Sequence, residues 1–391
     1  MSTPLTKQRY VALDVLRGMT VAGMILVNNP GNWGQIYPPL RHAAWTGCTP
    51  TDLVFPFFLF VVGTAMAFSF SRFLEGEGSM KNAYAKLYKR AALIFLTGLL
   101  LHAFPFVPTR KVADLTFWEN VVRYYSNLRI FGVLQRIAMA YALGGTLVLW
   151  LKKPKRISWA FVAVLLLHWI LLYAFGGEDP YGRETNFART VDLFLLGPNH
   201  VYKGYGLPFD PEGVLGMISG AGTVLMGYMA GIRIRKSPEK IHAMGSLYTW
   251  GLVALGVGMV WSIWLPISKP LWTSSYVLYA GGWTLLMLAF FIYLIDIKGK
   301  EKWFLPFRAL GLNPLFAFVL AGLSSKILGG LVRWTAADGT KYSALSWLYK
   351  NVFVAVFGNN PAGSLAYAIF YVAVFTLLAM LLYKKKIVIK L

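Results

Sequence analysis

Three polar residues near the start of the chain have the types and spacing that acid–base or nucleophilic chemistry needs. Asn28 ends the first apolar run, His42 follows in a polar segment, and Asp52 opens the second apolar run. A neutral imidazole can serve as a general base or a nucleophile. Asn28 fits either a helix cap or a substrate contact. Asp52 fits either a charge at a helix N-terminus or the carboxylate that orients His42.

A second polar pair, Gln135 and Arg136, lies inside a later apolar run. Arginine does not lose its proton in proteins, so Arg136 needs an anionic or carbonyl partner at membrane depth. The partner is Asp52, another acid or a ligand, and structural and ligand roles remain equally open. Among the other four histidines, His102 and His168 are expected to be buried structural residues and His242 a solvated loop residue, while the role of His200, in a long loop, remains open.

Several kinds of site are absent from the sequence. It contains no HExxH pair, no phosphate-binding or dinucleotide glycine motif and no GxSxG nucleophile motif. The single cysteine, Cys48, excludes an intramolecular disulfide and any cysteine-rich metal site. We therefore expect no metal.

The composition is that of a membrane protein that crosses the bilayer many times. Hydrophobic residues make up 57% of the 391 residues and charged residues only 14%, against about 25% in soluble domains. We predict an all-α fold with about ten transmembrane helices in one domain, 1–391. The predicted spans are 10–28, 52–71, 90–107, 130–151, 157–175, 213–232, 244–265, 273–295, 309–330 and 364–383.

The basic residues predict the orientation of these spans. The net charge is +22, and 23 of the 38 Lys and Arg residues fall on the face that would hold both termini, including Lys7, Arg9 and Lys390. Because cytoplasmic loops carry an excess of Lys and Arg, we predict that both termini are cytoplasmic. This orientation accounts for the high positive net charge, so we expect no nucleic acid as a partner.

The predicted outer loops are long and aromatic. They comprise 29–51, 108–129, 176–212 and 331–363. Their aromatic content argues against disorder, and long loops in compact domains are usually functional. We expect folded outer loops that cap an outward-facing site, with 341–357 as an interfacial or re-entrant helix.

Several distinctive sequence blocks follow one another along the chain. They are RYVALDVLRGMTVAGMILVNN (9–29), HAAWTGCTPTDLVFPFFLFVVGTAM (42–66), GVLQRIAMAY (132–141), FDPEGVLGMISGAGTVLMGYMAGI (209–232), PLWTSSYVLYAGGWTLLMLAFFIYLIDIKG (270–299) and GLNPLFAFVLAG (311–322). Together these blocks resemble the membrane-bound acyltransferases related to heparan-α-glucosaminide N-acetyltransferase.

This resemblance implies acetyl-CoA as donor, an amino-sugar or glycan acceptor, and transfer of the acetyl group across the membrane. It makes His42 the central catalytic residue, with Asn28 and Asp52 predicted to assist it. Within the resembling blocks, we predict that the substrate-binding residues are Gln135, Arg136, Asp210, Glu212 and Asn313. The resemblance also suggests a homodimer.

We therefore expect a transmembrane acyltransferase, in contact with membrane lipid, that acts on an extracytoplasmic amino sugar. The chain starts close to the first resembling block, so we expect a bacterial-type relative in the cytoplasmic (inner) membrane. The alternative is a secondary transporter or permease for an amino sugar such as N-acetylglucosamine, although the repeat-related halves of many transporters are not evident. A purely structural membrane protein would not need these polar residues at one depth.

Overall fold

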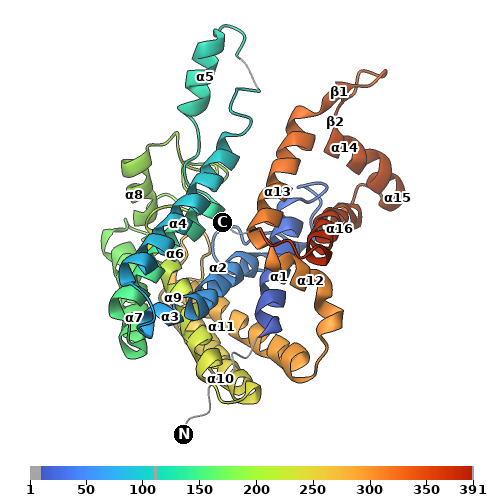
Figure 1. Cartoon of the computed structure of the whole chain (residues 1–391). Helices are drawn as coiled ribbons and strands as arrows, with labels where there is room; N and C mark the ends of the chain where they lie inside the picture. The colour runs from blue at the N-terminus through green and yellow to red at the C-terminus, as the bar shows by residue number, and fades with distance from the viewer. Residues whose placement is uncertain (1–9, 110–111, 390–391) are drawn as a thin grey trace.

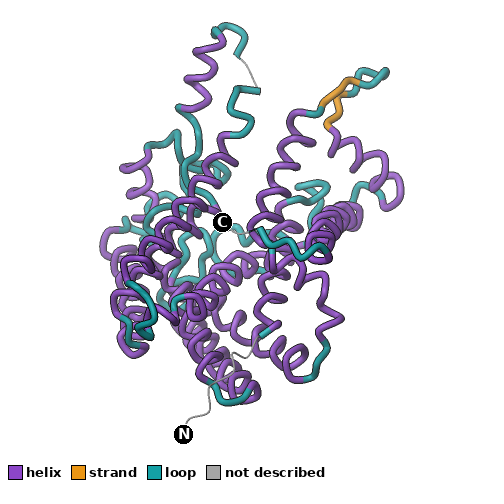
Figure 2. The backbone as a smooth tube through the Cα atoms, in the orientation of Figure 1, coloured by secondary structure: helices purple, strands orange, loops and turns teal. Residues whose placement is uncertain are grey.

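The protein is a bundle of helices with a single short β-hairpin (Figures 1 and 2). A computed structural model describes residues 10–109 and 112–389, so Lys7, Arg9 and Lys390 lie outside the described residues. The longer helices are α1 (Val11–Asn28), α2 (Pro50–Ser69), α4 (Met80–Ala103), α6 (Val133–Leu151), α7 (Pro154–Phe175), α9 (Gly216–Lys236), α10 (Lys240–Trp261), α11 (Ser274–Phe291), α13 (Pro314–Lys326) and α16 (Pro361–Lys384).

Shorter helical elements connect the long helices or cover their ends. They are α3 (Ser71–Leu74), α5 (Phe117–Tyr125), α8 (Phe187–Leu196), α12 (Leu305–Leu312), α14 (Ala344–Leu348) and α15 (Ala355–Phe357), the 3₁₀ turns Pro38–Leu40 and Glu301–Phe304, and the π-helical turns Ile292–Ile297, Ile327–Leu331 and Tyr349–Val354. The prediction of an all-α membrane protein is confirmed.

Nine helices within the described ranges are long and apolar enough to span a bilayer. They correspond to every predicted span except 90–107. That span falls in α4, and the first turns of α4 are rich in Lys and Arg. Yet α4 packs along α6 in the opposite direction: Gly98 faces Gln135, and Leu87 faces Gly145. Because α4 lies beside a membrane-length helix over this distance, we retain it as the tenth expected span.

Glycines allow α2 and α9 to cross closely. A Cβ atom on Gly63 would lie 2.0 Å from the carbonyl oxygen of Val224, and one on Gly227 would lie 2.0 Å from that of Phe60. Small residues at such a crossing bring the two backbones together where lipid offers no hydrophobic driving force. The crossing fixes α2, and therefore Asp52 at its first turn, against α9.

The two ends of the bundle differ. One end carries the long loops 29–49, 104–132, 176–215, 262–273 and 332–360, and we call it the His42 end; the other, with short basic loops, is the Lys236 end. At the His42 end α5 and the hairpin project upward in Figure 1.

The β-hairpin pairs β1 (Arg333–Thr335) with β2 (Lys341–Ser343) in antiparallel register. The segment 341–357, which we predicted to be an interfacial or re-entrant helix, begins in β2. It continues as a short apolar helix over Ala344–Phe357.

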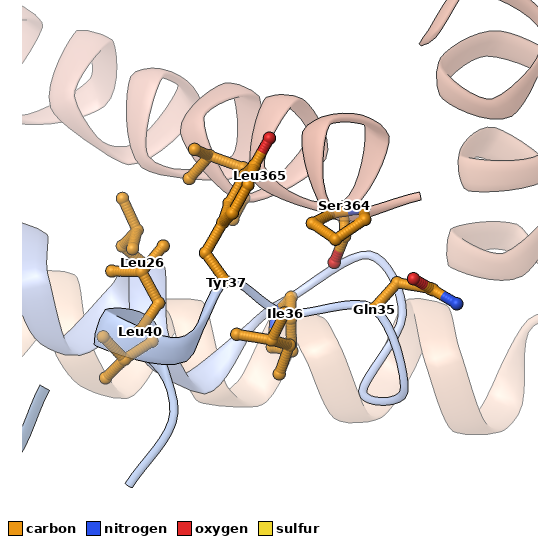
Figure 3. A pocket seen from close by; sticks show the side chains of 11 residues that line it. Leu26, Gln35, Ile36, Tyr37, Leu40, Ser364 and Leu365 are labelled. Atoms are coloured by element: carbon orange, nitrogen blue, oxygen red, sulfur yellow. The ribbon is translucent and has the colours of Figure 1, made fainter. Parts of the chain in front are cut away.

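The loop after α1 is attached to the start of α16. The backbone N–H of Gly31 donates to the carbonyl of Ser364 at 3.3 Å, and that of Asn32 donates to Ser364 Oγ at 3.0 Å. Figure 3 shows Tyr37 of this loop and Leu365 of α16 among the side chains that line a small apolar pocket. These contacts hold the first part of the segment that leads to His42.

The second part of the same loop is attached to two other loops. Trp45 Nε1 donates to the carbonyl of Tyr181 at 2.7 Å, and Ser268 Oγ donates to the carbonyl of Trp45 at 2.9 Å. The backbone N–H of Gly47 donates to the carbonyl of Ile267 at 2.7 Å. The position of His42 therefore depends on loops that are distant in the sequence.

Candidate active site

His42 and Asp52 are in direct contact at the His42 end. Nδ1 of His42 lies 2.6 Å from Oδ1 of Asp52. The His42 side chain is 48% exposed, whereas that of Asp52 is 1% exposed. If Nδ1 carries the hydrogen and donates it to the carboxylate, the lone pair of Nε2 is free, and within residues 10–109 and 112–389 Nε2 has no hydrogen-bond partner. This tautomer leaves Nε2 able to take a proton or attack a carbonyl.

Asp52 also caps its own helix. Its Oδ2 accepts hydrogen bonds from the backbone N–H groups of Thr49 and Ala43, both at 3.0 Å, and from Thr49 Oγ1 at 3.1 Å. Thr49 and Asp52 thus form a capping box at the N-terminus of α2. The two interpretations of Asp52 from sequence are compatible, because one oxygen caps the helix while the other holds His42.

Lys269 is the third member of this cluster. Its Nζ lies 3.4 Å from Asp52 Oδ1 and 3.1 Å from His42 Nδ1. When Nδ1 donates to Asp52 it cannot also accept from Lys269, so the ammonium group donates to the carboxylate. Burial lowers the pKa of Lys269, and Asp52 partly offsets that effect. One carboxylate is therefore shared by a lysine and a histidine.

A second charged group faces the same space. Arg129 donates to both carboxylate oxygens of Asp210, Nε to Oδ2 at 2.9 Å and Nη2 to Oδ1 at 2.6 Å, and Nη2 also donates to Glu212 at 2.5 Å. Burial opposes ionisation of Glu212, but Arg129 and Arg136 together bring its pKa below the usual value. The carboxylates fix the guanidinium of Arg129 at the wall of the cavity.

Arg136 is fully enclosed at the start of α6. Its Nη1 donates to the carbonyl of Pro211 at 2.5 Å, and its guanidinium lies 4.6 Å from the centre of the Trp272 ring. A Cβ atom on Gly216 would lie 1.9 Å from Arg136 Nη2, so a glycine there leaves room for the side chain. Nε of Arg136 is buried with no partner in the described part of the chain.

These side chains line one cavity of about 210 Å³. Of the predicted site residues, it brings together His42, Asp52, Arg136 and Glu212, and Asp210 lies just behind it through Arg129. Arg129 and Tyr202 also line a larger neighbouring cavity of about 870 Å³, whose wall includes Arg123 and Lys326 but no carboxylate. The smaller cavity can hold a reacting group, and the larger one provides space beside it.

Besides Asp210, three predicted residues do not line the smaller cavity. Asn28 is exposed at the end of α1. Gln135 is buried, with both polar side-chain atoms unpartnered among the described residues. Asn313, between α12 and α13, donates to the carbonyl of Ile387 at 3.1 Å and accepts from the N–H of Ile389 at 2.7 Å. Asn313 therefore holds the tail after α16.

Sequence reasoning missed Lys269 and Arg129. The only available signal was position, since both are basic residues in long loops on the face where basic residues are fewer. Lys269 is 227 residues from His42, and no local pattern connects them. Within the described part of the chain, no group of three or more His, Cys, Asp and Glu side chains is arranged to hold a metal ion.

Comparison with known proteins identifies similar sequences. A family profile described as heparan-alpha-glucosaminide N-acetyltransferase, catalytic, matches residues 9–198. The chain is 28% identical over 367 residues to the heparan-alpha-glucosaminide N-acetyltransferase of Mus musculus and 26% identical over 362 residues to that of Homo sapiens. Each match covers 80% of this chain, and the chain spans about half the length of these curated relatives, 53% and 52%.

Proposed function

We propose that this chain, which is similar in sequence to heparan-alpha-glucosaminide N-acetyltransferases, is a transmembrane acetyltransferase. The proposed donor is acetyl-CoA, and the proposed acceptor is the amino group of a glucosamine-type sugar or glycan. The whole chain, 1–391, would act as one catalytic domain in the bacterial cytoplasmic membrane. The reaction takes place at the His42 end, which we assign to the extracytoplasmic side.

The observation that carries the proposal is the pairing of a half-exposed His42 with a buried Asp52 at the wall of a cavity. A histidine that served only packing would not be half-exposed at the wall of a cavity. A family relationship together with an orienting carboxylate favours acid–base or nucleophilic work for this imidazole.

Two courses of the reaction use this geometry. In one, the nitrogen of the acceptor amine forms a bond to the acetyl carbonyl carbon while Nε2 of His42 takes a proton from that amine. CoA leaves as the thiolate or thiol. In the other, Nε2 itself attacks the carbonyl carbon and CoA leaves as the thiolate. The amine then displaces the imidazole, and the proton that its nitrogen loses passes to the released Nε2. In both, Asp52 holds Nδ1–H so that Nε2 stays available.

The cationic residues would assist in two ways. Lys269 offsets the charge of Asp52, from which its Nζ lies 3.4 Å. Arg136 and Arg129 place positive charge at the cavity, where an anionic group of a substrate could bind. Asn28, Gln135 and Asn313 remain predicted to contribute, Asn28 as a donor to the oxyanion, although none of the three lines the cavity.

The test is acetyl transfer from radiolabelled acetyl-CoA to glucosamine and related amino sugars by the purified chain. We expect transfer by the wild type and a loss of about 10²–10⁴-fold in His42→Ala, the usual contribution of a general base. His242→Ala, an exposed histidine at the Lys236 end, is the matched control and should be fully active. Label that stays on the wild type without acceptor would indicate the acetyl-imidazole course.

The same experiment judges the alternative function. If neither protein transfers acetyl to any acceptor, while the wild type moves an amino sugar across a vesicle membrane without CoA, the chain is a transporter and the proposed enzyme is wrong.

Asp52→Asn tests the orienting role. Asparagine can accept with only one oxygen, so it loses either the bonds to Ala43 and Thr49 or the bond to His42. We expect kcat to fall by about 10²-fold or more. Glu119→Gln removes the corresponding acid from a second capping box, at the start of α5, and should leave activity unchanged. Normal turnover of folded Asp52→Asn would exclude the orienting role.

A further inference from the structure

A second, apolar groove lies elsewhere in the bundle, on α7, α9, α10 and α11, which lie in the lower part of Figure 1. It has a volume of about 470 Å³ and shares no lining residue with the cavity at His42. Its lining includes Met226 and Met229 of α9 and Leu285 of α11, with α7 and α10 on either side. The established similarity to acetyltransferases does not account for it.

The groove opens sideways, toward the region that the bilayer would occupy. Val162 and Leu166 of α7 are 41% and 39% exposed, and Val253 and Val257 of α10 are 45% and 49% exposed, although all four line the groove. Along α7 the groove runs from Ser158 to Leu166, for about 12 Å at 1.5 Å per residue, and along α9 it runs from Met226 to Arg233. Both stretches lie toward the Lys236 end of their helices, and their length fits within one half of a hydrocarbon core about 30 Å thick, so the groove matches the acyl region of the leaflet at that end.

A single charged side chain, Arg233, lines the groove, at its end nearest the Lys236 end of the bundle. Its guanidinium donates to Ser246 Oγ at 3.3 Å and lies 4.8 Å from the centre of the Trp250 ring. No ion pair with a carboxylate forms at Arg233 in the part of the chain that the structure describes. A guanidinium at the end of an apolar groove is suited to a phosphate, which it can bind through two N–H groups.

Further cations surround this end. Lys240, which begins α10, lies 4.0 Å from the Asp296 carboxylate. Lys155 and Arg156 lie in the first turn of α7, and Lys236 ends α9. They attract an anionic headgroup and repel the ammonium group of a zwitterionic one. The neighbouring acid, Glu239, is already close to His242 at 3.8 Å.

We propose that this groove binds one anionic phospholipid, with an acyl chain along α7 and α10 and the phosphate on Arg233. The lipid belongs to the leaflet at the Lys236 end. Its binding does not depend on the proposed enzymatic function, because the groove and the cavity at His42 have separate linings.

Native mass spectrometry of the delipidated full chain, titrated with phosphatidylglycerol or phosphatidylethanolamine, tests this site. We expect the wild type to retain one phosphatidylglycerol in preference to phosphatidylethanolamine. Arg233→Gln should reduce that preference about tenfold, the effect of one charge-assisted hydrogen bond. Val253→Trp, which fills the groove from an exposed wall position, should abolish retention of the lipid.

Lys300→Gln is the matched control, since it removes an exposed cation in another basic loop at the Lys236 end and does not line the groove. It should keep the preference. Equal retention of both lipids by the wild type and Arg233→Gln would overturn the proposal. Displacement of the lipid by acetyl-CoA would also overturn it, because the groove would then bind the donor. A change of oligomeric state in Val253→Trp would overturn it as well, because the occupant of the groove would then be a second copy of the chain.

Discussion

At the scale of single residues, a shared carboxylate defines the candidate site. Asp52 holds His42 through one oxygen and the N-terminus of its own helix through the other, and Lys269 is beside both. The Cys48 thiol lies close by, and burial, with a smaller effect of Asp52, raises its pKa to about 12. A thiol with so high a pKa is a poor nucleophile near neutral pH, so His42 is the better candidate for covalent chemistry.

A second buried acid at this scale lies on α8. Asp192 is fully buried; Oδ1 accepts from the N–H of Val214 at 2.8 Å, and Oδ2 has no partner among the described residues. Burial raises the pKa of Asp192 to about 7, whereas an unfolded aspartate titrates near 3.9. Between these values the folded chain keeps a proton that the unfolded chain has lost, so the free energy of unfolding falls as pH rises from about 4 to about 7.

Asp192→Asn should remove this part of the pH dependence. We expect a flatter profile of melting temperature against pH over that interval, and a smaller loss of stability at pH 8 than in the wild type. Thermal unfolding of the purified chain in detergent at several pH values measures it. Asp338→Asn, in the exposed turn of the hairpin, is the control. An unchanged pH slope in Asp192→Asn would show that the carboxyl is not the group responsible.

At the scale of elements, the α2–α9 crossing carries the site. Because Gly63 and Gly227 place the two backbones in contact, Asp52 and the segment 210–216 meet at the same end of the bundle. In that segment, Asp210 accepts from Arg129 and the Pro211 carbonyl accepts from Arg136, while the backbone N–H of Val214 donates to Asp192. The packing of two helices therefore brings two sets of charged residues together.

Gly227→Ala tests the crossing. Its Cβ atom would lie 2.0 Å from the Phe60 carbonyl, a backbone atom that cannot rotate away. We expect a loss of about 1–3 kcal/mol in the free energy of unfolding, the usual cost of overpacking, and lower activity because α2 shifts. Gly256→Ala on α10 is the control, since its Cβ atom would meet nothing within 4 Å. Equal melting temperatures for the two variants would argue against a tight crossing.

At the scale of the whole molecule, the two ends of the bundle would face different compartments. The donor is proposed to come from the cytoplasm, while His42 is proposed to face the other side. The acetyl group must therefore pass through the bundle. The short basic loops are at the Lys236 end, and the long loops with α5 and the hairpin are at the His42 end.

Cysteine labelling in intact cells measures this orientation. In a Cys48→Ser background, Asp338→Cys at the hairpin turn should react with an impermeant maleimide from outside. Lys300→Cys, in a basic loop at the Lys236 end, should react only after the membrane is permeabilised. Both positions are exposed, so access and not burial decides the result. The reverse pattern would place His42 on the cytoplasmic side and remove the need for transfer across the membrane.

The sequence by itself determined the class of fold and pointed to the contact between His42 and Asp52. Long apolar runs have few alternatives to membrane helices, because unpaired backbone groups are costly in lipid. His42 and Asp52 are ten residues apart, and the capping box at Thr49 turns the chain back on itself between them. Local chemistry was therefore sufficient to predict this contact.

The tertiary structure alone decided the rest of the site. Lys269 reaches His42 from 227 residues away, and Arg129 reaches Asp210 from 81. Asn313 matched a resembling block, yet its amide is bonded to the tail at Ile387 and Ile389. Such contacts depend on how the loops between separate helices pack at one end of the bundle. The hydrophobic pattern of the sequence predicts which helices form, but it does not predict which loops contact one another.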